Sequence, residues 1–117
     1  MITHPKTEEL AKAVADWIDQ VRPSLDPHNQ FLARVAVNVL GVVQRELTQG
    51  PPAEAEAVRL MAELLGHPGS FAELNAELCD RIRSGELTVE SPGLAPALTT
   101  MAMAQVAIDQ PKYRHEV

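Results

Sequence analysis

Glycine and proline divide this chain into segments that each carry a helical pattern of apolar residues. The breaks fall at Pro23, Pro27, Gly50–Pro52, Gly66–Gly69, Gly85, Pro92–Gly93 and Pro111. Between them, apolar residues recur at three- and four-residue steps, and no segment shows the alternation of a strand. We therefore predict an all-α fold, a single-domain bundle of about five helices over residues 1–117, mostly antiparallel. The expected helices cover residues 7–22, 27–49, 53–65, 71–84 and 92–110, with tails at 1–6 and 112–117.

The ends of these helices follow from local signals. Pro27 suits a first helical position, and Gly50 suits the left-handed residue that ends a helix. Ser70 and Glu73 have the spacing of a capping box. We expect Leu10, Val14 and Trp17 to form an inward apolar stripe on the first helix. We expect helix 27–49, which is apolar over half its circumference, to lie centrally in the bundle.

Composition narrows the function classes. The chain has ten basic and sixteen acidic residues, a net charge of −6, and no cluster of Lys or Arg. Nucleic acids and anionic membranes are therefore poor candidate partners, since both reward clustered positive charge. The single cysteine, Cys79, excludes an intramolecular disulfide and suits a reducing compartment. The N-terminus does not resemble a signal peptide and no apolar run is long enough for a membrane span, so we expect a cytoplasmic protein.

Four residues of helix 27–49 form a polar seam. Arg34, Asn38, Gly41 and Arg45 are separated by four, three and four residues, so they share one face. Gly41 would let another backbone or a ligand come close. One interpretation is a docking seam for a partner or an anionic ligand. The other is an ordinary helix surface on which Gly41 gives room to a neighbouring helix.

Glu46 falls at helical spacing among Val35, Val39 and Val42, on the apolar side of the same helix. A buried carboxylate must be paired or have a raised pKa, so Glu46 could act as a general base. It could instead pair with an arginine such as Arg22, Arg81 or Arg83, or reach water near the helix end.

The last helix is apolar on two faces. Leu94, Leu98, Met101 and Ile108 make one stripe, which Gln105 interrupts. Met103 and Val106 lie on the opposite face with several alanines. Such a helix is either sandwiched in the fold or placed at an interface. We therefore mark Met103, Gln105 and Val106 as a candidate interface, with another helix or a second copy as the partner of Gln105.

No catalytic constellation is evident. His4, His28, His67 and His115 lack the spacing of a helical metal pair, so we predict no metal site and no cofactor. Cys79 lies beside an apolar stripe and has no neighbouring base in the sequence, which favours a packing role. No phosphate-binding loop, kinase or hydrolase motif is present.

Three stretches together resemble a bacterial family of small helical proteins of unknown function. They are residues 31–40 with 45–47, residues 74–87, and residues 107–113. Members of that family are often encoded beside a phosphotransferase-fold kinase and an acyl-CoA dehydrogenase-like protein, and the accessory subunit of the levulinate-pathway hydroxyacyl-CoA kinase is similar. The resemblance implies an accessory subunit whose partner performs the chemistry, and it implies no catalytic residue.

Two alternatives remain beside the accessory subunit. One is a homo-oligomeric helical scaffold joined through the last helix. The other is a stand-alone enzyme that uses the group Arg34, Asn38, Arg45 and Glu46, which would require a concave pocket around those side chains.

Overall fold

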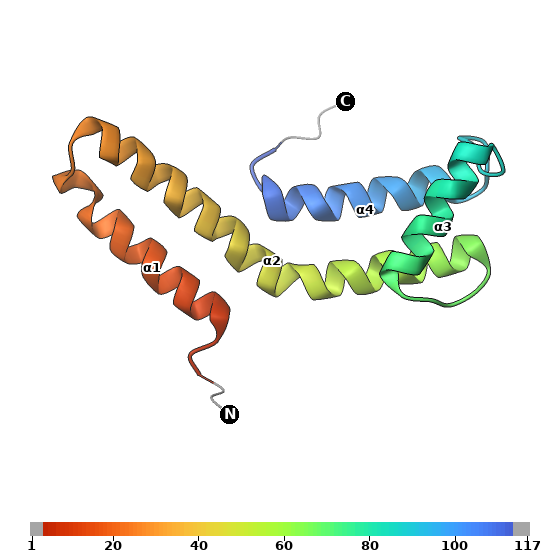
Figure 1. Cartoon of the computed structure of the whole chain (residues 1–117), viewed down its shortest axis with the longest axis horizontal. Coiled ribbons are helices and arrows are strands. Elements are labelled where there is room, and N and C mark those ends of the chain that lie inside the picture. Colours follow the sequence, from red (N-terminus) through yellow and green to blue (C-terminus); the bar gives the residue numbers. More distant parts are fainter. Residues whose placement is uncertain (1–3, 114–117) are drawn as a thin grey trace. The chain divides into compact units, whose positions relative to one another are not determined.

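The computed structural model describes residues 4–113, and every regular element in that range is helical (Figure 1). The elements are α1 (Thr7–Val21), the 3₁₀ turn η1 (Arg22–Ser24), α2 (Pro27–Leu65), α3 (Phe71–Ser84) and α4 (Leu94–Asp109). The all-α prediction is confirmed, with four α-helices in the described range rather than about five. His115 and parts of both expected tails lie outside the described residues.

The difference in helix number arises at Gly50, Pro51 and Pro52. The two helices expected at 27–49 and 53–65 are one continuous helix, α2. Gly50 does not take the expected left-handed conformation, since the positive φ angles of the described glycines belong to Gly66, Gly85 and Gly93. Proline has a φ close to the helical value, so the chain can continue through it. The cost is two missing N–H donors, which leaves the carbonyls of Leu47 and Thr48 without their usual helical partners.

The chain divides into two compact units, and the division falls within α2 at these prolines. One, the hairpin unit, comprises Met1–Gly50 with Ile108–Gln110. The other, the core unit, comprises Pro51–Ala107 with Pro111–Val117. Each is described by itself below, and the single-domain prediction stays a prediction.

The core unit has a well-formed apolar centre. Its buried cluster is Ala57, Met61 and Leu65 of α2, Leu74 and Leu78 of α3, and Leu94 of α4. Local signals fix the helix ends: Ser70 Oγ accepts from the Glu73 amide at 3.2 Å, which is the first bond of the predicted capping box. The Ser70 hydroxyl itself, rather than its backbone amide, donates to the Glu73 carboxylate at 2.9 Å. Gly85 ends α3 with φ of 85°. The contacts within the buried cluster hold α3 and the start of α4 against the second half of α2.

The start of α4 differs slightly from the prediction. The helix begins at Leu94 rather than Pro92, and Ser91 accepts a hydrogen bond from the Thr88 amide at 2.9 Å within the preceding connector. Pro96 therefore lies in the first turn, where its missing N–H has no helical acceptor to lose.

In the hairpin unit, α1 and the first half of α2 run antiparallel side by side (Figure 1). Gln30 closes the connection by donating to the Leu25 carbonyl at 2.8 Å. The buried side chains of the two helices within this unit are two alanines, Ala15 (6 % exposed) and Ala33 (8 %). α1 and the first half of α2 thus have no centre of large buried side chains between them, although Ile108, which also belongs to this unit, is 1 % exposed at the end of α4.

The large apolar residues of the hairpin unit are exposed instead, which corrects the predicted inward stripe. Trp17 is 61 % exposed, and Leu10 and Val14 are about half exposed. We call the exposed set the hairpin face: Leu10, Val14, Trp17, Phe31, Leu32, Val35, Val39, Val43 and Leu47. The physical reason is that the alanines Ala15 and Ala33 are buried between the helices. The larger residues directly before them, Val14 and Leu32, therefore point away from the contact.

Candidate functional site

Arg45, one member of the predicted seam, contacts the end of α4. Its Nε donates to the carbonyl oxygen of Ile108 at 2.6 Å. Ile108 lies in the last turn of α4, where carbonyls have no partner within their own helix. That turn contains no basic residue of its own. Arg45 therefore supplies both a donor and a positive charge to a helix C-terminus, a structural role.

Gly41 makes room for that arginine. A Cβ built on Gly41 would lie 3.0 Å from Nη1 of Arg45. The close approach predicted at this glycine is therefore made by a side chain of the same helix, one turn further along. A larger residue at position 41 would press on the guanidinium while it is bound to Ile108.

The rest of the seam is open. Arg34 and Asn38 are exposed, and no hydrogen bond or ion pair of either side chain is found within residues 4–113. Glu46 is also exposed, so the burial considered for it is not observed. Its carboxylate lies over Gly50, where a Cβ would be 2.8 Å from Oε1. Arg45 thus contacts the end of α4 beside Gly41, while Arg34, Asn38 and Glu46 are exposed, and the docking interpretation of the seam stays a prediction.

Two of the three residues of the predicted interface on α4 are exposed, and the third is half-buried. Met103 is 45 % exposed, Gln105 is exposed and Val106 is half-buried. Asp109, the last residue of α4, carries the only charge in this helix. A surface helix normally presents charged residues to water, whereas the centres of protein interfaces are depleted of charge.

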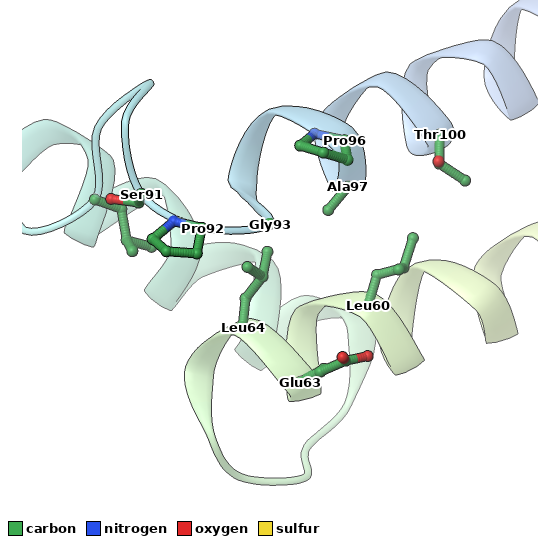
Figure 2. Close-up of a pocket in the computed structure, with 10 residues that line it drawn as sticks. Leu60, Glu63, Leu64, Ser91, Pro92, Gly93, Pro96, Ala97 and Thr100 are labelled. Carbon is green, nitrogen blue, oxygen red and sulfur yellow. The ribbon is translucent and has the colours of Figure 1, made fainter.

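A pocket of about 580 Å³ lies within the core unit, between the second half of α2 and the start of α4. In Figure 2, Leu60 and Leu64 project from α2 toward Pro96 and Ala97 of α4. The remaining lining residues are Glu63, Leu87, Ser91, Pro92, Gly93 and Thr100. The volume is in the range of ligand sites. The sequence motifs did not indicate this pocket, because its walls come from three separate segments of ordinary apolar residues.

The chemistry of this pocket is limited. Glu63 is its one charged group, and that carboxylate also accepts from Arg59 at 3.3 Å. Residues 51–107 contain eight acidic and three basic residues. Negative potential opposes ligands that carry phosphates, so the core unit by itself is poorly suited to hold a CoA-type molecule.

An exposed charge network joins the turn before α3 to that helix. His67 Nε2 lies 2.9 Å from the Glu77 carboxylate, which also pairs with Arg81 at 2.9 Å. The pKa of His67 is raised above its ordinary value, first by the hydrogen bond of the ring with the Pro68 carbonyl and then by Glu77. The network links the turn before α3 to α3 itself and lies on the surface, which favours a role in holding that turn in place.

Groups suited to metal binding or membrane insertion are not found in the described part of the chain. Residues 4–113 hold no cluster of three or more His, Cys, Asp or Glu side chains that could bind a metal ion. No helix among them has the length and apolar character needed to cross a membrane. Cys79 is half-buried on α3.

Comparison with known proteins places the chain in a family. Residues 23–113 match the family described as a domain of unknown function, DUF6285, and the chain belongs to it. This match covers α2, α3, α4 and the connectors between them. No curated protein and no solved structure matches the chain.

Proposed function

We propose that this member of the DUF6285 family is a non-catalytic binding subunit of a phosphotransferase-fold kinase that acts on acyl-CoA-type substrates. The observation that carries the binding role is the uncharged surface of α4. Leu98 is 38 % exposed and Met103 is 45 % exposed, on a helix without a charged side chain from Leu94 to Ile108. Such a surface resembles the centre of an interface more than a solvated helix.

The surroundings of α4 indicate the chemistry of the partner. In residues 51–107 of the core unit, acidic residues outnumber basic ones by eight to three, so a partner with a basic rim fits best. An enzyme that holds CoA phosphates needs positive charge, which agrees with this expectation. The choice of a phosphotransferase-fold kinase rests on the resemblance in residues 31–47, 74–87 and 107–113.

A stand-alone enzyme built on the seam is not proposed. Arg45 is engaged with the Ile108 carbonyl, and the Glu46 carboxylate lies over Gly50, toward the end of the hairpin unit's part of α2. Residues 4–113 hold no cluster suited to a metal ion, and the pocket of the core unit is lined by neither Arg45 nor Glu46. The homo-oligomeric scaffold joined through α4 is the competing outcome of the experiment below.

The test is co-expression with the phosphotransferase-fold kinase that the resemblance expects to be encoded beside this protein. Size-exclusion chromatography with light scattering then follows. We expect a mixed complex that Met103→Lys weakens at least tenfold, because a lysine at the centre of an apolar contact must be desolvated. Val89→Lys is the matched control, since Val89 is 87 % exposed in the connector before α4. Separate elution of the two proteins, with kinase activity unchanged by addition of this chain, would contradict the proposal. Self-association through Met103 without the kinase would favour the scaffold.

A further inference from the structure

The hairpin face is large for an uncovered surface. Its nine side chains are 39 % to 61 % exposed. At about 150–250 Å² for a full aromatic residue, and proportionately less for Val and Leu, they present on the order of 800 Å². The largest apolar patch of a typical monomer is about 300–600 Å². A standard interface removes about 800 Å² from each partner, so this face has the area that a specific complex requires.

The two stripes of this face lie on the same side of the hairpin. Val14 precedes the buried Ala15 on α1, and Leu32 precedes the buried Ala33 on α2. A step of one residue back along the chain rotates the side-chain direction by about 100° about the helix axis, and the rotation relative to the chain direction is the same in both helices. Because the helices run antiparallel (Figure 1), equal rotations away from the shared contact bring both stripes to one side. The face is therefore continuous across α1 and α2.

We propose that the hairpin face binds the hairpin face of a second copy of this chain, so that the two hairpins pack face to face. Three observations select a second copy. The first is the area above, which matches a two-fold interface in which each copy contributes the same patch.

The second observation is charge balance. Residues 1–50 contain five basic and six acidic residues, in contrast to the strongly acidic core unit. Within α1 and η1, two of the four acidic side chains are paired: Asp16 with Lys12 at 2.6 Å and Asp19 with Arg22 at 3.2 Å. Two acidic chains can therefore approach through this face with little repulsion. A face with no net charge also has nothing to select a strongly charged foreign partner.

The third observation is the geometry of the α2 stripe. Phe31, Val35, Val39, Val43 and Leu47 follow one another at steps of four residues. Such a row is the ridge that interdigitates with an identical ridge when two helices cross at about −50°. Val39 is the central residue, so a two-fold axis near it would pair the Phe31 end of one copy with the Leu47 end of the other.

The core unit is a poorer cover for this face. Its large exposed apolar residues within the described range are six side chains on four segments: Phe71 and Ile82 on α3, Val89 in the connector, Leu98 and Met103 on α4, and Tyr113 after α4. They form no stripe comparable to that of α2. Most of the core unit's large apolar side chains already pack against one another.

Trp17 gives a direct test, because it is the only tryptophan in the chain and lies on the hairpin face. Light scattering of the full-length chain should give twice 12.7 kDa at high concentration. On dilution, the Trp17 emission maximum should move to longer wavelength as the ring returns to water. Val39→Asp should raise the dissociation constant at least about a hundredfold, and Val89→Asp should leave it unchanged. Far-UV circular dichroism checks that each variant stays folded. The dilution experiment uses the unaltered chain, so it tests the proposal even if a variant fails to fold.

Other outcomes overturn the proposal. A monomer at high concentration with water-exposed Trp17 emission would mean that no second copy binds. A monomer with short-wavelength emission at every concentration would mean that the chain's own core unit covers the face. Association that survives Val39→Asp but not Met103→Lys would place the contact on α4. A shift of Trp17 emission only on addition of the kinase would assign the face to that partner.

Discussion

At the scale of single residues, Arg45 provides the sharpest test of the seam. Arg45→Met keeps much of the aliphatic stem but removes the donor to the Ile108 carbonyl and the charge at the end of α4. We expect the free energy of unfolding to fall by about 1–2 kcal/mol. Arg34→Met is the matched control on the same face, and it should change stability by less than about 0.5 kcal/mol because Arg34 is exposed. Urea denaturation measures both, and equal effects would contradict the structural role of Arg45.

Gly41 should be coupled to Arg45. Gly41→Ala gains up to about 1 kcal/mol of helix propensity, but its Cβ would meet the Arg45 guanidinium at 3.0 Å. In the unaltered background the gain should be largely cancelled, whereas in the Arg45→Met background it should appear in full. A double-mutant cycle measured by urea denaturation gives this coupling. Additive effects would show that the guanidinium is free to move aside.

The sequence predicted correctly that Arg34, Asn38, Gly41 and Arg45 share a face, because helical period alone decides that. It could not predict that Arg45 binds a carbonyl 63 residues away, since a backbone acceptor leaves no side-chain pattern. The exposure of Glu46 was equally hidden. Its neighbours at helical spacing are apolar, but apolar neighbours imply burial only when that side of the helix is covered.

At the scale of elements, the proline pair within α2 can be tested by substitution. Pro51→Ala restores an N–H donor inside the helix. We expect a net stabilisation of about 2 kcal/mol, the cost of an interior proline less the entropy that the unfolded chain regains. Pro96→Ala is the control: Pro96 lies in the first turn of α4, so this change should be neutral or slightly destabilising. Thermal unfolding measures both, and a fall in midpoint for Pro51→Ala would mean that α2 depends on this proline.

The turn that joins α2 to α3 should make the core unit sensitive to pH. The pKa of His67 is raised, by its hydrogen bond with the Pro68 carbonyl and by Glu77. A raised pKa in the folded state stabilises the protein below the unfolded value of about 6.5, and this contribution is lost as pH rises through the folded value. Stability of the core unit should therefore decrease as pH rises above about 6.5.

Two variants isolate that effect. His67→Gln and Glu77→Gln should both flatten the pH dependence of the core-unit unfolding transition, since each removes one side of the 2.9 Å contact. His28→Gln, in the hairpin unit, should leave the slope of that transition unchanged. A slope that persists in His67→Gln would assign the pH dependence to another group.

Elements whose ends depend on local chemistry were predicted well. The capping box at Ser70 and the left-handed Gly85 fix α3 at the residues expected. The break expected at Gly50 was wrong because Pro51 and Pro52 are compatible with two local structures. Proline can open a new helix, or it can lie inside an existing one, where the two prolines cost two hydrogen bonds. The sequence does not show which of these two structures has the lower free energy.

At the scale of the whole molecule, periodicity identified the apolar stripes but not what they contact. Met61, Leu74 and Leu78 lie on apolar stripes of their helices and are buried in the core unit. Leu10, Val14 and Trp17 follow the same spacing and are exposed. The pattern reports that side chains share a face, and it is the same whether that face meets its own chain or another one. The pocket between α2 and α4 was hidden for a related reason, since it depends on which segments become neighbours.

The contrast between the two units leads to a last prediction, which concerns how unfolding depends on protein concentration. The described helices of the hairpin unit bury alanines between them, so most of its stability should come from the second copy that covers the hairpin face. A folded state stabilised by association becomes more stable as concentration rises. In urea, the transition followed by Trp17 fluorescence should therefore move to higher denaturant with increasing protein, whereas the later loss of helix from the core unit should not move. Val39→Asp should abolish the concentration dependence of the first transition, and Val89→Asp should retain it. If both transitions coincide and ignore concentration, the hairpin unit is stabilised within its own chain, and the exposed stripes of α1 and α2 require another explanation.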